Sequence, residues 1–207
     1  MSQKYEYLEE NERVLEEFKG YWDGLVSCGA EKYVLLASTA AMLERYKKMR
    51  VRAGDVWVVT YPKCGTTWTQ EMVWQIVNKC DFERGKLPLF ERFPFLEIDT
   101  LIKDRQLDIL DNLEKQEGPR LIKTHLPLSL LPDNLLETGK VVYVARNPKD
   151  VLVSYYHHHK LVRGHDYTGD LPGFSKWFMK EQVSLKLLLI TSTILYSGDV
   201  QPILPSS

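Results

Sequence analysis

The sequence predicts an α/β fold, in which a parallel sheet is flanked by helices and carries a P-loop-like, phosphate-binding strand–loop–helix unit. Three observations predict it. Residues 56–59 form a β-branched and aromatic run, which is typical of a buried strand in a parallel sheet. Two further short apolar runs follow, at 120–123 and 141–145. Helical or turn-like segments separate the runs, as expected when helices cover a parallel sheet.

The elements follow in order along the chain. Residues 33–36 favour a short strand, and Ser38 or Thr39 then caps a helix that continues to Tyr46. The strand 56–61 leads to a helix over 67–78, capped by Thr66 or Thr67. Segment 81–94 contains Gly85 and two prolines and is expected to be a loop, and the apolar spacing in 101–115 indicates a helix.

Length and charge limit the class of protein. A chain of 207 residues with 27 basic and 28 acidic residues predicts one domain over 1–207, with no bulk charge for nucleic acid or a membrane surface. Three scattered cysteines favour free thiols in a reducing compartment. The polar start of the chain is no signal peptide, and the apolar run 187–195 is too short for a membrane span, so we expect a cytoplasmic protein.

The loop at 61–68 is the most informative motif. Pro62 and Gly65 end the strand, so that free backbone N–H groups and the positive end of a helix dipole meet beside Lys63. A nucleoside triphosphatase loop ends in Gly-Lys followed by Ser or Thr, whereas here Lys63 precedes the glycine. The loop therefore predicts a phosphate site without the usual magnesium arrangement, which disfavours a nucleotide kinase.

Two later stretches carry polar residues at strand ends. Arg146 follows the run 141–145, with Asn147 as N-cap, Pro148 at the first helical position and Ser154 about two turns along that helix. Arg146 could grip a phosphate; the alternative is an ion pair with Asp150 and a surface hydroxyl at Ser154.

Lys123 and His125 end the run 120–123 and lie two residues apart, on the same side of an extended chain. His125 could act as a general base near neutral pH; the alternative is a hydrogen-bonded turn residue beside a proline.

Together the three stretches, Tyr-Pro-Lys-x-Gly-Thr-Thr-Trp, Lys-Thr-His-Leu-Pro and Arg-Asn-Pro-x-Asp-x-x-x-Ser, resemble the cytosolic sulfotransferases, and they stand in that family's order. The resemblance implies that the chain transfers a sulfuryl group from 3′-phosphoadenosine-5′-phosphosulfate (PAPS), without a metal. It implies His125 as general base, Lys63 and Lys123 as catalytic cations, and a cofactor site made of Lys63, Cys64, Gly65, Thr66, Thr67, Trp68, Arg146 and Ser154.

The resemblance also bears on the acceptor. Segment 92–97 resembles the family's acceptor-pocket segment, so Phe95 and, in the Tyr-Tyr-His segment, His158 are expected to face a small molecule; Phe93 is expected in the core. Consecutive histidines at 157–159 point about 100° apart on a helix, which disfavours a zinc site. Phenols, steroids, other alcohols and amines all remain open as acceptors.

Two departures from the family follow. Cys64 replaces the usual serine, and beside Lys63 at a helix N-terminus its thiolate is expected to be favoured and oxidation-sensitive. The resemblance covers about 30–182; the tail 183–207 diverges and lacks the family's Arg-Lys-Gly and dimerisation segments. Weak PAPS affinity and low turnover are therefore expected, and a truncated, inactive PAPS-binding relative is the alternative.

Overall fold

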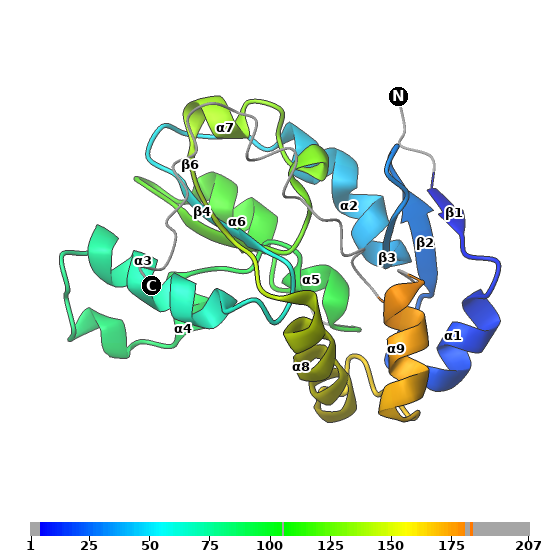
Figure 1. The fold of residues 1–207 in the computed structure, drawn as a ribbon. Coiled ribbons are helices and arrows are strands. Elements are labelled where there is room, and N and C mark those ends of the chain that lie inside the picture. Colours follow the sequence, from blue (N-terminus) through cyan, green and yellow to red (C-terminus); the bar gives the residue numbers. More distant parts are fainter. Residues whose placement is uncertain (1–4, 105, 181–182, 184–207) are drawn as a thin grey trace.

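A parallel sheet lies at the centre of the computed structural model, which describes residues 5–104, 106–180 and 183. Strand β4 (Val56–Thr60) is central and pairs in parallel with β5 (Leu121–Thr124) on one side and β6 (Lys140–Val144) on the other (Figure 1). The predicted parallel sheet and its three strands are confirmed.

The two faces of this sheet are buried under different helices, because successive side chains of a strand point to opposite faces. Trp57 and Val59 pack in one core with α2 (Ala37–Lys48), α6 (Ile109–Lys115) and the short α7 (Leu135–Thr138). Val56 and Val58 pack in another core with α3 (Thr66–Val77) and α4 (Leu89–Arg92) (Figure 1).

A second, antiparallel sheet contains β1 (Tyr5–Tyr7), β2 (Leu25–Cys28) and β3 (Tyr33–Leu36). The strand expected at 33–36 is therefore present, but it does not join the parallel sheet. Its link to β2 is too short for a parallel crossover, so the two strands form a hairpin.

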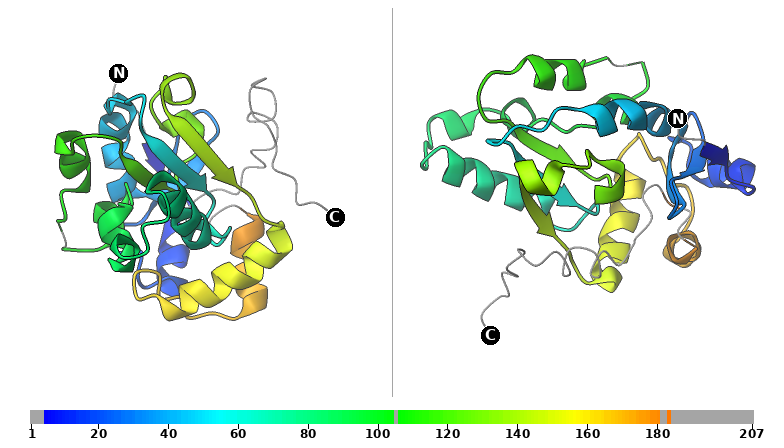
Figure 2. Two further views of the ribbon diagram at one scale, coloured as in Figure 1. Left: turned by 90° about the vertical axis from the view of Figure 1, so that its left-hand side faces the viewer. Right: turned by 90° about the horizontal axis from the view of Figure 1, so that it is seen from above.

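Helices α1 (Asn11–Glu17), α8 (Pro148–Leu161) and α9 (Leu171–Met179) complete this side of the molecule (Figures 1 and 2). They share a third core with β2 and β3 that is rich in aromatic side chains. Trp177 Nε1 donates to the Glu17 carboxylate at 2.9 Å, which joins α9 to α1.

The helix expected over 101–115 is wrong as a single element. The chain forms α5 (Ile98–Leu101) and α6, because the Asp99 carboxylate accepts from the N–H groups of Leu107 and Ile109 at 2.7 and 2.8 Å and folds the intervening chain back. The expected loop 81–94 contains a 3₁₀ turn, η1 (Arg84–Lys86), as well as α4; a second 3₁₀ turn, η2, spans Leu128–Leu130.

Two predicted helix caps are also wrong, whereas the third is confirmed. In α2 the Ser38 N–H is capped by the Asp23 carboxylate, so neither Ser38 nor Thr39 is the cap. In α3 the cap is Gly65 in a left-handed conformation, and Thr66 is already helical. The Asn147 side chain accepts from Lys149 N–H at 3.0 Å, and Pro148 begins α8 as expected.

Across the described residues, no helix is long and apolar enough to cross a bilayer. Of the divergent tail 183–207, only Val183 lies within the described part of the chain, and its side chain is buried in the third core.

Candidate active site

A cavity of about 990 Å³ opens where β4, β5 and β6 end. Its lining contains the residues that the sequence singled out, with one exception; they are Lys63, Gly65, Thr66, Thr67, Trp68, Phe95, Lys123, His125, Arg146, Ser154 and His158. The carboxyl ends of parallel strands are where open α/β folds bind ligands.

The exception is Cys64, which differs from expectation in both position and reactivity. Its side chain is buried in the third core, near Tyr61 and Tyr155, and its backbone N–H donates to Tyr61 O at 3.3 Å. Burial raises the pKa of the Cys64 thiol, although the nearby Arg146 acts in the opposite direction. The expected thiolate is therefore wrong, because desolvation outweighs the helix terminus and the cation.

The loop between β4 and α3 presents unused N–H groups to the cavity. Lys63 and Gly65 both have left-handed φ angles, of 67° and 86°. The first helical hydrogen bond runs from Thr69 N–H to Gly65 O at 3.0 Å, so the N–H groups of Thr66, Thr67 and Trp68 precede the helical ladder. A left-handed lysine costs about 1–3 kcal/mol, and such strain is common where a loop is shaped around a ligand.

The side chains of this helix start differ in their freedom. Thr66 Oγ1 lies 2.7 Å from Thr60 Oγ1 and is buried, whereas Thr67 is exposed. The Trp68 indole is 79% exposed at the cavity wall, which leaves its face open to a planar ligand.

The Arg146 side chain contacts the loop between β4 and α3, although the residue stands just before helix α8 in the chain. Its Nη1 donates to Lys63 O at 3.3 Å, and no ion pair joins it to Asp150 among the described residues. The alternative of a structural Arg146–Asp150 pair is therefore not observed there. Ser154 lines the same cavity from α8.

His125 is fixed in one orientation. Its Nδ1 is 2.8 Å from Thr60 O, and because a carbonyl can only accept, Nδ1 carries the proton and Nε2 keeps its lone pair. Burial and the charge of Lys123 lower the pKa of His125 to about 3, so the ring is neutral near pH 7. Its ring meets Phe95 edge-on, with centroids 5.1 Å apart.

Two further titratable groups, the half-buried Lys123 and the buried Glu97, lie beside His125. The Lys123 ammonium lies 3.9 Å from the centroid of the Phe95 ring, and burial lowers its pKa, with Glu97 opposing and Lys63 adding to the shift. Glu97 is only 3% exposed and its Oε1 accepts from the His125 N–H at 2.6 Å. Burial raises the pKa of Glu97, although that hydrogen bond and Lys123 oppose the shift.

The three consecutive histidines of α8 lie in three different environments. His157 is exposed, His158 lines the cavity, and His159 is buried, with Nε2 at 2.8 Å from Tyr21 OH and Nδ1 at 2.9 Å from Tyr155 O. Burial lowers the pKa of His158 to about 4, with Lys63 and Lys123 adding to it. Within the described part of the chain, no three His, Cys, Asp or Glu side chains are placed to hold a metal.

The sulfotransferase domain family matches residues 53–189, which contain every part of this cavity named so far. The chain belongs to the sulfotransferase family. It is 37% identical over 174 residues to the luciferin sulfotransferase of Photinus pyralis, covering 76% of this chain and 46% of that protein. It is 42% identical over 159 residues to sulfotransferase 1A1 of Canis lupus familiaris, covering 74% of this chain and 53% of that protein. The chain thus spans about half the length of these curated relatives.

A solved structure of retinol dehydratase in complex with retinol and PAP has the same fold, with a TM-score of 0.77 at 28% identity, covering 89% of this chain and 63% of that one. A structure of retinol dehydratase in complex with androsterone and the inactive cofactor PAP has a TM-score of 0.78 at 26% identity, with the same coverage of both chains.

The sulfotransferase cavity has a second half that the motifs did not reveal. It comes from the N-terminal segment, the end of β3, α5 and the chain that follows α5 and α8, where no spacing or turn signal marks a site. Its residues include Lys19, Gly20, Trp22, Leu36, Ile98, Leu101, Ile102, Lys103, Val162, Arg163, Gly164 and His165. Glu97 was likewise missed as a partner of His125, although it ends the segment that resembles the acceptor pocket.

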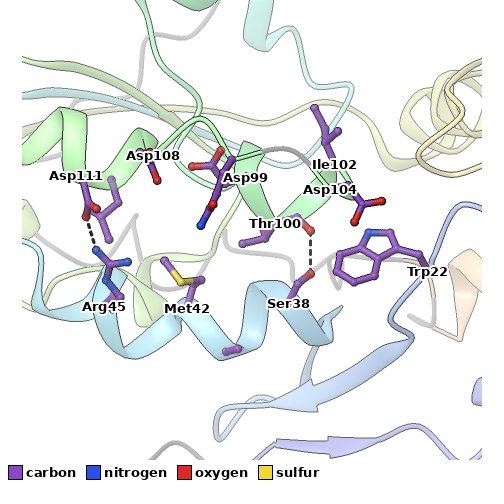
Figure 3. A pocket seen from close by; sticks show the side chains of 13 residues that line it. Trp22, Ser38, Met42, Arg45, Asp99, Thr100, Ile102, Asp104, Asp108 and Asp111 are labelled. Atoms are coloured by element: carbon purple, nitrogen blue, oxygen red, sulfur yellow. Dashed lines mark hydrogen bonds and ion pairs between the residues drawn. The ribbon is translucent and has the colours of Figure 1, made fainter.

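A smaller cavity of about 620 Å³ lies beside the first, between α2 and the chain around α5 and α6 (Figure 3). The two cavities share Trp22 and Ile102. Figure 3 shows Ser38 bonded to the Thr100 carbonyl and Arg45 paired with Asp111, and further aspartates line the same space. The contacts of Asp99 and Asp111 show that these carboxylates hold the surrounding chain together.

Proposed function

We propose that this chain transfers a sulfuryl group from PAPS to a hydroxyl or amine of a small-molecule acceptor, with His125 as general base. The observation that carries the proposal is the orientation of His125. Its Nδ1–H is bound to Thr60 O, and among the described residues no hydrogen bond reaches Nε2, in a cavity that also contains Lys63 and Lys123. Membership of the sulfotransferase family and the PAP in the retinol dehydratase structures support the same reading.

The residues around His125 suit each part of the transfer. The acceptor O–H or N–H gives its proton to His125 Nε2 while its oxygen or nitrogen bonds to sulfur. The bond between sulfur and the 5′-phosphate oxygen breaks, and its electron pair leaves with the phosphate of PAP. Lys63 stabilises the charge that builds on this leaving oxygen, and Lys123 holds the sulfuryl oxygens. Sulfuryl transfer, like phosphoryl transfer, depends mainly on such positioning and charge stabilisation.

Other residues of the cavity hold the nucleotide. The N–H groups at the start of α3 and the hydroxyls of Thr66 and Thr67 receive the 5′-phosphate, as helix N-termini commonly do. Arg146 and Ser154 bind the 3′-phosphate, and adenine stacks on the exposed Trp68 ring.

The lowered pKa of His125 is compatible with a base. The ring is already neutral near pH 7, the form that accepts a proton. A bound anion beside the imidazole would raise its pKa, because opposite charge favours the protonated form. Phe95 and His158 line the cavity next to this ring and would contact the acceptor.

A second candidate function is binding of PAP or PAPS without turnover. It is favoured by the pKa of His125, which burial and Lys123 lower to about 3, because a weakly basic imidazole removes a proton poorly. The two candidates differ only in turnover.

The test combines binding and turnover. Calorimetry measures binding of PAP and of ATP to the purified chain without metal, and [³⁵S]PAPS measures transfer to a panel of phenols, alcohols and amines. We expect PAP to bind and ATP to bind much more weakly. His125→Ala should abolish transfer with PAP affinity unchanged, and Arg146→Ala should remove the preference for PAP over ATP.

A further variant examines Lys123. Because its pKa is lowered by burial, its charge and the turnover should be lost at a pH below the ordinary range of a lysine, and Lys123→Arg should shift this alkaline loss upward.

PAP binding without turnover would favour the second candidate. A folded chain that binds no PAP, or transfer that survives His125→Ala, would overturn the proposal.

A further inference from the structure

The large cavity has a one-sided charge. Among the described residues, its lining includes six cationic side chains and no aspartate or glutamate; the cations are Lys19, Lys63, Lys103, Lys123, Arg146 and Arg163. In the proposed function Lys63, Lys123 and Arg146 act on the nucleotide and the sulfuryl group. The remaining three, which we call the rim cations, have no role in that function.

The rim cations lie at the opposite end of the cavity from the phosphate groups. Arg146 immediately precedes the cap of α8 and Arg163 follows its last turn. A helix of 14 residues is about 21 Å long, so the two arginines are separated by roughly that distance. Ser154 and His158 line the cavity between them.

The three rim cations come from segments that meet at one point, Gly164. A Cβ on Gly20 would lie 2.3 Å from the Gly164 carbonyl carbon, and a Cβ on Gly164 would lie 3.6 Å from Leu101 O. Lys19 and Arg163 are direct neighbours of these glycines, and Lys103 follows Leu101 by two residues. The backbone therefore brings the three charges to one edge of the cavity.

Within the described residues the rim cations are not neutralised. None of the three takes part in an ion pair there, and all three are exposed. The nearest carboxylates along the chain, Glu17, Asp104 and Asp166, do not line this cavity. Glu17 accepts from Trp177 Nε1, and Asp104 faces the smaller cavity (Figure 3).

The same cavity also has apolar lining residues, several of them neighbours of the rim cations in the chain; they include Trp22, Leu36, Ile98, Leu101, Ile102 and Val162. We infer that the acceptor is a hydroxy acid with an apolar body, whose hydroxyl lies at His125 and whose carboxylate lies among Lys19, Lys103 and Arg163. This rests on the proposed function and narrows it. A cationic amine would meet like charges at this edge, with no carboxylate among the described lining residues to pair with it.

The test uses three phenols of matched shape: 3-(4-hydroxyphenyl)propionate, its methyl ester, and tyramine. Transfer from PAPS gives kcat/KM for each, and calorimetry gives their affinity for the PAP complex. We expect both kcat/KM and affinity to decrease in the order carboxylate, ester, amine. An exposed ion pair is worth up to about fivefold in affinity, so the triple variant Lys19→Gln, Lys103→Gln, Arg163→Gln should reduce the carboxylate-to-ester ratio about fivefold or more. Added salt should reduce the same ratio in the unmodified chain.

The matched control is the triple variant Lys115→Gln, Lys140→Gln, Lys176→Gln, whose lysines are exposed and line neither cavity. It should leave the carboxylate-to-ester ratio unchanged. Equal use of ester and carboxylate, or a ratio that is the same in both triple variants, would overturn the inference. If no phenol is turned over but the PAP complex binds the carboxylate best, the inference stands and the proposed transferase activity fails. If the PAP complex binds none of the three, the inference fails.

Discussion

The ion pair between Asp55 and Arg120 provides a sharp test of how this fold is held together. Both side chains are fully buried, at the start of β4 and β5. Arg120 Nε donates to Asp55 Oδ1 at 2.9 Å and Nη2 to Oδ2, which makes the pair bidentate. Nη1 and Nη2 also donate to the carbonyls of Leu113 and Arg50. Each guanidinium nitrogen therefore has a partner that water would otherwise supply.

Asp55→Asn keeps the shape of the side chain and removes its charge. Arg120 then remains buried with no counter-charge among the described residues, and an unpaired buried charge of this kind costs about 3–5 kcal/mol. Domains of ordinary stability have only about 5–15 kcal/mol in total. The thermal midpoint should fall by about 6–20 °C, at about 2–4 °C per kcal/mol for a chain of this length.

Urea denaturation followed by circular dichroism measures this cost. The control is Asp111→Asn, which removes the partner of Arg45 at the surface and should cost less than about 1 kcal/mol, because water solvates the exposed arginine. The double variant Asp55→Asn, Arg120→Met should cost less than the sum of the two single variants by about 1 kcal/mol or more. Equal effects of Asp55→Asn and Asp111→Asn, or strict additivity in the double variant, would refute the reasoning.

Three other predictions follow from burial and close packing. Gly20→Ala should destabilise the protein by about 1–3 kcal/mol, because its methyl group would meet the Gly164 backbone at 2.3 Å, whereas Gly164→Ala meets only an ordinary contact and should be tolerated in the same urea titration. Burial lowers the pKa of His159, so the folded state stays neutral while the unfolded state gains a proton below about pH 6.5; this residue should account for about 2 kcal/mol of the stability lost between neutrality and about pH 5, and the loss should be smaller by that amount in His159→Gln. A thiol reagent should modify the exposed Cys80 well before the buried Cys64, and equal rates for the two would contradict the assigned burial.

The sequence predicted those parts of the site that are local in the chain. The strand, loop and helix around Lys63, and the strand, cap and helix around Arg146, are each set by neighbours within a few residues, so periodicity and turn chemistry suffice. The parallel sheet then brings their ends together, because both strands run in the same direction beside each other.

The parts that could not be predicted depend on distant partners. At the start of α2 the Ser38 N–H donates to the Asp23 carboxylate, which comes from an earlier segment, so the serine does not cap the helix with its own side chain. The split between α5 and α6 depends on the Asp99 carboxylate, which binds two N–H groups further along the chain. The rim of the cavity likewise exists only where Gly20 meets Gly164, and neither glycine is part of a recognisable motif.

The central position of β4 has a consequence for synthesis on the ribosome. Val56 pairs with Leu121 on one side and Lys140 on the other, so the strand that leads into the loop at Lys63 lacks both of these partners until much later in translation. At about 5–20 residues per second, the wait for β6 is on the order of 10 s. During this time an apolar strand with two unpaired edges is open to chaperones and to other nascent chains. Translation speed through residues 61–140 should therefore govern how much of this chain folds rather than aggregates.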